Sequence, residues 1–154
     1  MTLGEKIKKC RKLHKLSQKK LGLACGFLEA SADVRIRQYE NNKQSPKSVL
    51  RKKIVEALDI DDEAISNFNI STDIDIMHMF FELEEKLGMT IEKNDGKTLL
   101  VFDDSNNDIA TLINYMNIWY NKKTSLPNNS EITNEQMTEY LLWKTRFKKN
   151  IDNE

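Results

Sequence analysis

The side chains best suited to molecular recognition lie in one stretch, residues 31–42, which contains two arginines and a glutamine. Arg and Gln side chains form paired hydrogen bonds with guanine and adenine in the DNA major groove. The stretch is expected to form a helix from Ala32 onward, because Ser31 can accept hydrogen bonds from first-turn amides and Asp33 places negative charge there. Ile36 and Tyr39 then face inward. The outward polar residues are Asp33, Arg35, Arg37, Gln38 and Asn41.

A surface helix of this composition also occurs in proteins that never contact DNA, so the rest of the chain must decide. The 154 residues have zero net charge and are enough for one ordinary domain or two small ones. Residues 1–54 hold 15 Lys and Arg against 4 Asp and Glu, a net charge of +11, whereas residues 55–154 hold 9 against 20, a net charge of −11. A basic segment attracts phosphate, and an acidic segment more naturally meets proteins or water. Any single lysine could be merely solvated, but so complete a division predicts two ends with different partners.

Catalytic and metal chemistry find little support. His14 and His78 have no second His, Cys or carboxylate at a ligand spacing, and the chain has no Gly-rich phosphate loop or nucleophile elbow. In the acidic loop 103–108, a calcium site would need a glycine where Ile109 stands and a glutamate where Tyr115 stands. A solvated loop is therefore expected there, and the two cysteines, Cys10 and Cys25, are expected to be reduced core thiols. We expect no enzyme activity, metal or cofactor.

Five short helices are expected before residue 68, over about 3–14, 18–25, 32–42, 47–58 and 63–67. Ser17 is a good N-cap for the second helix, and Gly26 can end it. Asp61 or Asp62 could cap the fifth helix. The apolar face of the fourth helix would comprise Val49, Leu50, Ile54, Val55 and Leu58. Two short helices around a Gly-containing turn indicate a helix-turn-helix.

These residues resemble the Cro and lambda-repressor type of helix-turn-helix, the XRE family. The resemblance rests on Leu16-Ser17-Gln18, Leu21, Gly26-Phe27, the segment 36–43 and Ser45-Pro46. It implies a five-helix, lambda-repressor-like DNA-binding domain over residues 1–68. The sequence departs from the family pattern between Gly26 and Glu40, where it has about four more residues. The turn before the third helix is therefore longer, and that helix could begin at Ala32 or one turn earlier.

The resemblance also implies roles for individual residues. Asp33, Val34, Arg37 and Gln38 would face the groove, Arg35 would reach a base or a phosphate, and Gln18, Lys43 and Ser45 would contact the DNA backbone. With the residues flanking them, the expected DNA-binding set is Gln18, Ser31, Asp33, Val34, Arg35, Arg37, Gln38, Asn41, Lys43 and Ser45. A structural ion pair between Arg11 and Glu40 would tie the first helix to the third.

Residues 72–154 are expected to form a separate, small α+β module of a helix over 73–87, a β-hairpin, and helices over 109–120 and 134–149. Asn94-Asp95-Gly96 is a strong hairpin signal. Because a two-stranded hairpin is not stable alone, the helices are expected to cover it. The last third of the chain is rich in aromatic side chains, namely Trp119, Tyr120, Tyr140, Trp143 and Phe147. They would form either the core of the module or a surface for a partner or for self-association. Their helical periodicity does not distinguish these two alternatives.

Two functions from different classes fit these observations. The first is a sequence-specific regulator of transcription, a repressor that binds double-stranded DNA as a homodimer, with the acidic module supplying dimer contacts or binding a protein or small ligand. The second is an inhibitor or adaptor from a mobile element whose acidic module binds a protein. No apolar run approaches the roughly 20 residues that span a bilayer, and the N-terminus lacks the apolar core of a signal peptide. We therefore expect a cytoplasmic protein with no membrane partner.

Overall fold

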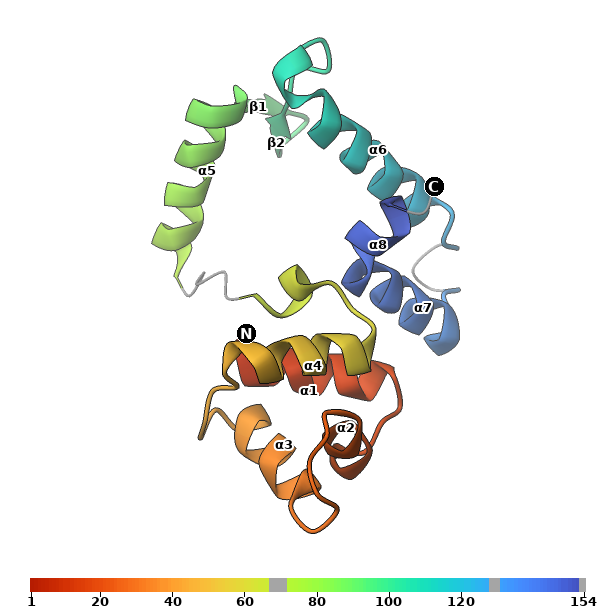
Figure 1. The fold of residues 1–154 in the computed structure, drawn as a ribbon. Helices are drawn as coiled ribbons and strands as arrows, with labels where there is room; N and C mark the ends of the chain where they lie inside the picture. Colours follow the sequence, from red (N-terminus) through yellow and green to blue (C-terminus); the bar gives the residue numbers. More distant parts are fainter. Residues whose placement is uncertain (67–71, 128–130, 153–154) are drawn as a thin grey trace. The chain divides into compact units, whose positions relative to one another are not determined.

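The computed structural model describes residues 1–66, 72–127 and 131–152, and the chain forms two compact units (Figure 1). The first unit combines Met1–Asn67 with Ile132–Glu154, and the second unit is Phe68–Glu131. The architecture is mainly helical, with one antiparallel hairpin, as the sequence predicts. The sequence predicts that residues 132–154 belong to the second module, whereas the structure groups them with the N-terminal helices.

The N-terminal part of the first unit contains α1 (Leu3–Leu13), α2 (Gln18–Ala24), α3 (Ala32–Glu40), α4 (Ser48–Leu58) and the 3-10 helix η1 (Asp62–Ile65). Its core includes Ile36 and Tyr39, confirming their predicted inward orientation. The rest of this core is Ile7, Cys10, Leu21, Cys25, Ile54, Leu58, Ile60 and Ile65. The predicted place of Val49 in the apolar face is wrong, because this first-turn residue of α4 is 69% exposed.

A glycine lets α2 and α3 approach each other closely. A Cβ atom on Gly22 would lie 2.4 Å from the backbone oxygen of Ala32 and 2.7 Å from its carbonyl carbon. Real Cβ atoms do not come so near to backbone atoms, so this helix pair tolerates no larger residue at position 22 without moving. The first turn of α3 is thereby held directly against α2.

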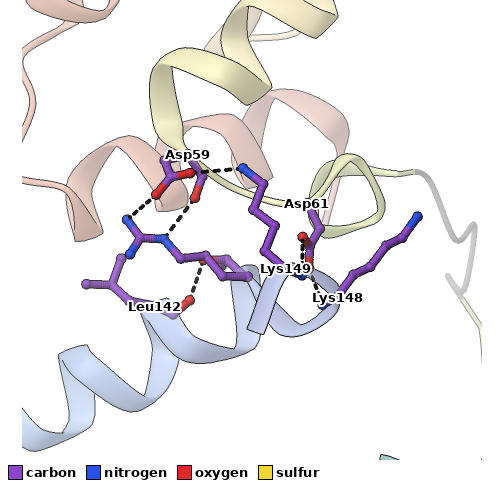
Figure 2. A network of polar contacts seen from close by, with 7 residues as sticks. Asp59, Asp61, Leu142, Lys148 and Lys149 are labelled. Carbon is purple, nitrogen blue, oxygen red and sulfur yellow. Dashed lines mark hydrogen bonds and ion pairs between the residues drawn. The ribbon is translucent and has the colours of Figure 1, made fainter. Parts of the chain in front are cut away.

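The chain returns to the first unit as α7 (Asn134–Thr145) and α8 (Phe147–Ile151). Asp61, which follows α4, donates its backbone N–H to the carbonyl oxygen of Thr145 at 2.8 Å. Its carboxylate accepts hydrogen bonds from the backbone N–H groups of Lys148 at 2.7 Å and Lys149 at 3.2 Å (Figure 2). These are the second and third residues of α8. The Asp61 carboxylate therefore caps the N-terminus of a helix far away in the sequence, while Arg146 holds the N-cap position itself.

This role corrects two expectations. The Asp61 side chain does not cap η1. In place of the expected fifth helix over 63–67, the structure has the short 3-10 helix η1 over Asp62–Ile65. Residue 67, the last of the expected helix, lies outside the described residues. The expected single helix over 134–149 is interrupted at Arg146, which separates α7 from α8.

A second contact beside Asp61 is made by Asp59, which ends α4 in the left-handed conformation, with φ of 47°. Its carboxylate lies 3.1 Å from Arg146 Nη2 and 2.9 Å from Lys149 Nζ, and its carbonyl oxygen accepts from Arg146 Nε at 2.8 Å (Figure 2).

Tyr140 is buried and stacks on Trp143. The aromatic residues of α7 therefore belong to the first unit.

The second unit contains α5 (Asp73–Leu87), β1 (Thr90–Asn94), β2 (Lys97–Val101), the 3-10 helix η2 (Asn107–Ile109) and α6 (Ala110–Thr124). The bounds of α5 are the expected ones; Thr72 caps this helix and Gly88 ends it in the left-handed conformation. The strands pair antiparallel from Thr90 opposite Val101 to Asn94 opposite Lys97, joined by a turn with positive φ at both central residues. The expectation that helices cover the hairpin is wrong, because every strand residue except Val101 is exposed.

Candidate nucleic-acid interface

The exposed face of α3 lies opposite the side that the core holds. At about 100° per residue, Ala32, Ile36 and Tyr39 share one side of the helix, and all three are buried. Val34, Arg37, Gln38 and Asn41 share the opposite side; Val34, Arg37 and Asn41 are exposed and Gln38 is half-buried. A valine side chain, a guanidinium and the Asn41 amide therefore project from one surface, and Gln38 lies on the same side of the helix. Side chains of these types read base edges in a major groove.

The flanks of this face carry the other predicted residues of the helix. Arg35 is exposed on one flank, and Asp33 is half-buried on the other. The helix begins at Ala32, as predicted, after a turn in which the Leu28 carbonyl accepts from the N–H groups of Ser31 and Ala32. Ser31 holds the N-cap position, but its side chain does not cap the helix as expected, because its hydroxyl donates to the Leu28 carbonyl at 3.3 Å.

A buried ion pair fixes the far end of α3. Arg11 Nε lies 2.5 Å from Glu40 Oε1, and Arg11 Nη2 donates to Glu40 Oε2 at 3.0 Å. Gln18 Nε2 donates to the same Oε2 atom at 2.8 Å, and Arg11 Nη1 donates to the Leu16 carbonyl at 2.7 Å. The predicted structural pair of Arg11 and Glu40 is therefore present, and Gln18 joins it. The network links α1, α2 and α3 through charge-assisted hydrogen bonds.

A model of the helix-turn-helix family matches residues 7–65, from within α1 to the end of η1. The N-terminal domain is a helix-turn-helix domain of the Cro/C1 type, in the XRE family. The match to this family indicates that the protein is a DNA-binding regulator of transcription. A comparison with curated proteins finds no match for the chain.

Within this helix-turn-helix domain, the loop after α3 presents the remaining predicted contacts. Lys43 and Ser45 are exposed. Asn42, to which the sequence analysis gave no role, holds the loop in place from a positive φ of 54°. Its Oδ1 atom accepts from the Gly4 N–H at 3.0 Å, and its Nδ2 atom donates to the Thr2 hydroxyl at 2.8 Å. Asparagine tolerates this backbone conformation, which is the signal that could have identified it.

Gln38 must rotate before it can read an adenine. Its side-chain oxygen is buried without a hydrogen-bond partner, whereas a paired contact to adenine requires that oxygen to accept from the base. A partly buried, unsatisfied amide oxygen carries a desolvation cost, which such a contact would remove. On the exposed face of α3, the Arg37 side chain is already accessible, whereas the Gln38 side chain would have to rearrange for such a contact.

Part of the basic charge of the helix-turn-helix domain lies away from α3. Four lysines of the N-terminal segment line a shallow groove of about 520 Å³ between α1 and α7, whose apolar floor includes Leu13 and Leu141. These lysines are Lys8, Lys9, Lys12 and Lys15. The strong positive charge of residues 1–54 is therefore spread over more than one surface, and the sequence total overstates the charge beside α3.

The acidic loop over residues 103–108 and the two cysteines are the other features that the sequence singles out. Asp103 accepts hydrogen bonds from the backbone N–H and the hydroxyl of Ser105, and these bonds lower the pKa of Asp103. In the part of the chain that the structure describes, no three His, Cys, Asp or Glu side chains are grouped to hold a metal ion. Cys10 and Cys25 are free and buried, as expected. Among the same residues, no helix is long and apolar enough to traverse a lipid bilayer.

Proposed function

We propose that this chain is a transcriptional repressor that reads a specific site in double-stranded DNA as a homodimer. The observation that carries the proposal is the face of α3 formed by Val34, Arg37, Gln38 and Asn41, set opposite a buried side within a helix-turn-helix domain. A helix bound in the major groove of a promoter excludes other proteins from that groove, so repression is its simplest consequence.

The roles within this interface follow from side-chain chemistry. Arg37 suits guanine, Gln38 suits adenine after rotation, and Val34 suits the methyl group of thymine. Asp33 can accept from the amino group of cytosine, whereas Arg35 on the flank can reach a base or a phosphate. Asn41 would donate to a base or the backbone at the end of the helix.

The phosphate contacts come from the elements around α3. Lys43 and Ser45 are exposed in the loop after it, and the Ser31 hydroxyl stands at its start. Gln18 stands at the N-terminus of α2, where the helix dipole favours a phosphate. One N–H of its amide binds Glu40, which leaves the second to donate to DNA.

A dimer follows from the geometry of duplex DNA. Two recognition helices reach successive major-groove faces on one side of the duplex when they are about 34 Å apart, and a two-fold protein then reads an inverted repeat. The full-length chain should therefore retain an inverted repeat from a randomised duplex library at about 150 mM salt. It should also lower transcription from a template that carries the selected site.

Substitutions separate base readers from phosphate contacts. Arg37→Ala should lose discrimination at one base pair by about 1–3 kcal/mol, whereas Lys43→Ala should weaken binding to all sequences and reduce the salt dependence by about one ion. Lys122→Ala, near the exposed end of α6 in the second unit, is the matched control and should leave binding unchanged. Equal effects of the two test variants on every sequence would contradict these roles. A library that yields no motif would instead favour the inhibitor or adaptor function.

A further inference from the structure

The groove between α1 and α7 combines an apolar floor with positive charge that the fold does not neutralise. Leu13 and Leu141 are half-buried in its floor. Four exposed lysines also line it, and in the part of the chain that the structure describes their ammonium groups make no ion pair and no side-chain hydrogen bond. These lysines are Lys8, Lys9, Lys12 and Lys15. A surface with both properties suits a partner that is apolar on one side and anionic beside it.

The positions of these lysines are unfavourable for α1 itself. Lys8 and Lys12 are four residues apart and Lys9 is three residues from Lys12, so their like charges are neighbours on the helix and destabilise it. Glu5, a carboxylate that also lines the groove, accepts from the Thr2 backbone N–H at 2.8 Å and so belongs to the cap of α1. Folding of α1 therefore does not account for the lysine cluster, whereas binding of an anionic partner does.

The groove lies on the side of α1 that is remote from α3. Gly4 faces α3, because a Cβ atom there would lie 2.3 Å from a carbonyl oxygen of that helix. Arg11 pairs with Glu40 on the same side of α1. At about 100° per residue, Lys9 and Leu13 lie on the opposite side. A duplex bound to the exposed face of α3 therefore leaves the groove open, and its lysines are available to a different partner.

The shape of the groove indicates a helix as that partner. A volume of about 520 Å³ is within the range of small-molecule pockets. Such pockets enclose most of their ligand, however, whereas this groove is shallow and open to solvent. A groove between two helices can accept the apolar face of a third. The residues of α1 that line it run from Glu5 to Leu13, about 12 Å along the axis, which matches about two turns of a docked helix.

The charge of the rim then selects the composition of the docked helix. Its apolar side chains would lie on Leu13 and Leu141. The side chains beside them would meet the ammonium groups of Lys8 and Lys12, which favour Asp and Glu and disfavour Lys and Arg. We propose that the groove between α1 and α7 binds a short, acidic, amphipathic helix of a partner protein. This site goes beyond the proposed function, because it is separate from α3 and requires no DNA.

Selection from a displayed library of randomised peptides of about 16 residues tests the class of ligand. The library is selected on the full-length chain and depleted on the double variant Lys8→Glu/Lys12→Glu, both without DNA. Enriched peptides should carry apolar side chains at positions i, i+3, i+4 and i+7, with Asp or Glu beside them. Enriched peptides that are basic or lack this spacing would overturn the proposal, and so would a selection in which no peptide prefers the wild-type chain.

Fluorescence anisotropy with one enriched peptide measures the contribution of the lysines. Lys8→Glu/Lys12→Glu should weaken binding by about tenfold or more, because attraction becomes repulsion. Lys52→Glu is the matched control and should leave binding unchanged, since Lys52 is exposed on α4 and does not line the groove. A peptide with Lys in place of every Asp and Glu should bind the double variant more tightly than the wild-type chain, which also shows that the variant is folded. Equal weakening by Lys52→Glu, or no such reversal, would contradict docking in this groove.

DNA binding separates this site from the proposed function. Lys8→Ala/Lys12→Ala should keep both the DNA motif and the salt dependence of the wild-type chain. A salt dependence reduced by about two ions would mean that these lysines contact phosphate, and the docking of a helix would then be wrong. A chain that selects no DNA motif but binds the acidic peptide would refute sequence reading by α3 and support this groove as a protein-binding site.

Discussion

The substitution Asp61→Ala tests whether the C-terminal helices are an integral part of the DNA-binding unit. The Asp61 side chain accepts from two backbone N–H groups of α8, and the residue is 8% exposed. Loss of an N-cap interaction costs about 0.5–2 kcal/mol. We expect a cost at the upper end of this range, because Asp61 is buried and water cannot replace its carboxylate as the acceptor of the two N–H groups. We expect the free energy of unfolding of the first unit to fall by about 2 kcal/mol.

Asp59→Asn is the matched comparison, since asparagine tolerates the left-handed conformation at this position. The Asp59 side chain is 62% exposed, and its partners Arg146 and Lys149 are 34% and 42% exposed. Exposed ion pairs contribute about 0.2–1 kcal/mol and weaken with salt. This variant should therefore cost less than about 1 kcal/mol, and the cost should shrink further in 0.5 M salt.

Denaturant unfolding followed by Trp143 fluorescence in a Trp119→Phe background measures both variants, because Trp143 lies in α7. The reasoning requires Asp61→Ala to cost clearly more than Asp59→Asn, with only the second cost sensitive to salt. If Asp61→Ala were neutral, or if the two variants ranked in the opposite order, then α8 would not depend on Asp61 for its cap.

Three further predictions concern the first unit. Burial lowers the pKa of His14 below 6.5, so the unfolded chain binds the proton more tightly than the folded chain does. The free energy of unfolding should therefore fall as the pH drops below 6.5. His14→Gln should reduce this pH dependence when unfolding is measured at pH 7.5 and 5.5. Gly22→Ala should destabilise the domain by about 1–3 kcal/mol and weaken DNA binding, because its Cβ meets the Ala32 backbone, whereas Leu23→Ala on the exposed side of α2 should do neither. Burial raises the pKa of Cys25 to about 11, so a thiol reagent at pH 8 should label it about 100-fold more slowly than a free thiol until denaturant is added.

The sequence predicts the local elements of this protein well, because their signals are local. Ser17 caps α2 as expected, and the segment Asn94-Asp95-Gly96 lies at the turn of the hairpin that it predicted. The family resemblance predicted the pairing of Arg11 with Glu40, which joins residues distant in sequence. It could do so because that contact belongs to the part of the chain that the family pattern covers.

Contacts outside that pattern could not be predicted from spacing. Asp61 was read as a cap for the helix that follows it, because capping signals in a sequence concern the next few residues. Its actual partner is α8, and no local pattern connects the two. The direction of the Ser31 hydroxyl was missed for a related reason, since the turn before α3 offers the Leu28 carbonyl as a competing acceptor.

The family match ends at residue 65, but the folded unit that contains it does not. Asp61 binds the last residue of α7 through its backbone N–H and α8 through its carboxylate, and Asp59 binds Arg146 and Lys149. In chain order, the second unit is therefore an insertion between two parts of the DNA-binding unit, connected to it at both ends. A fragment that ends near residue 70 would lack the partners of both aspartates, and its DNA affinity would describe an incomplete domain.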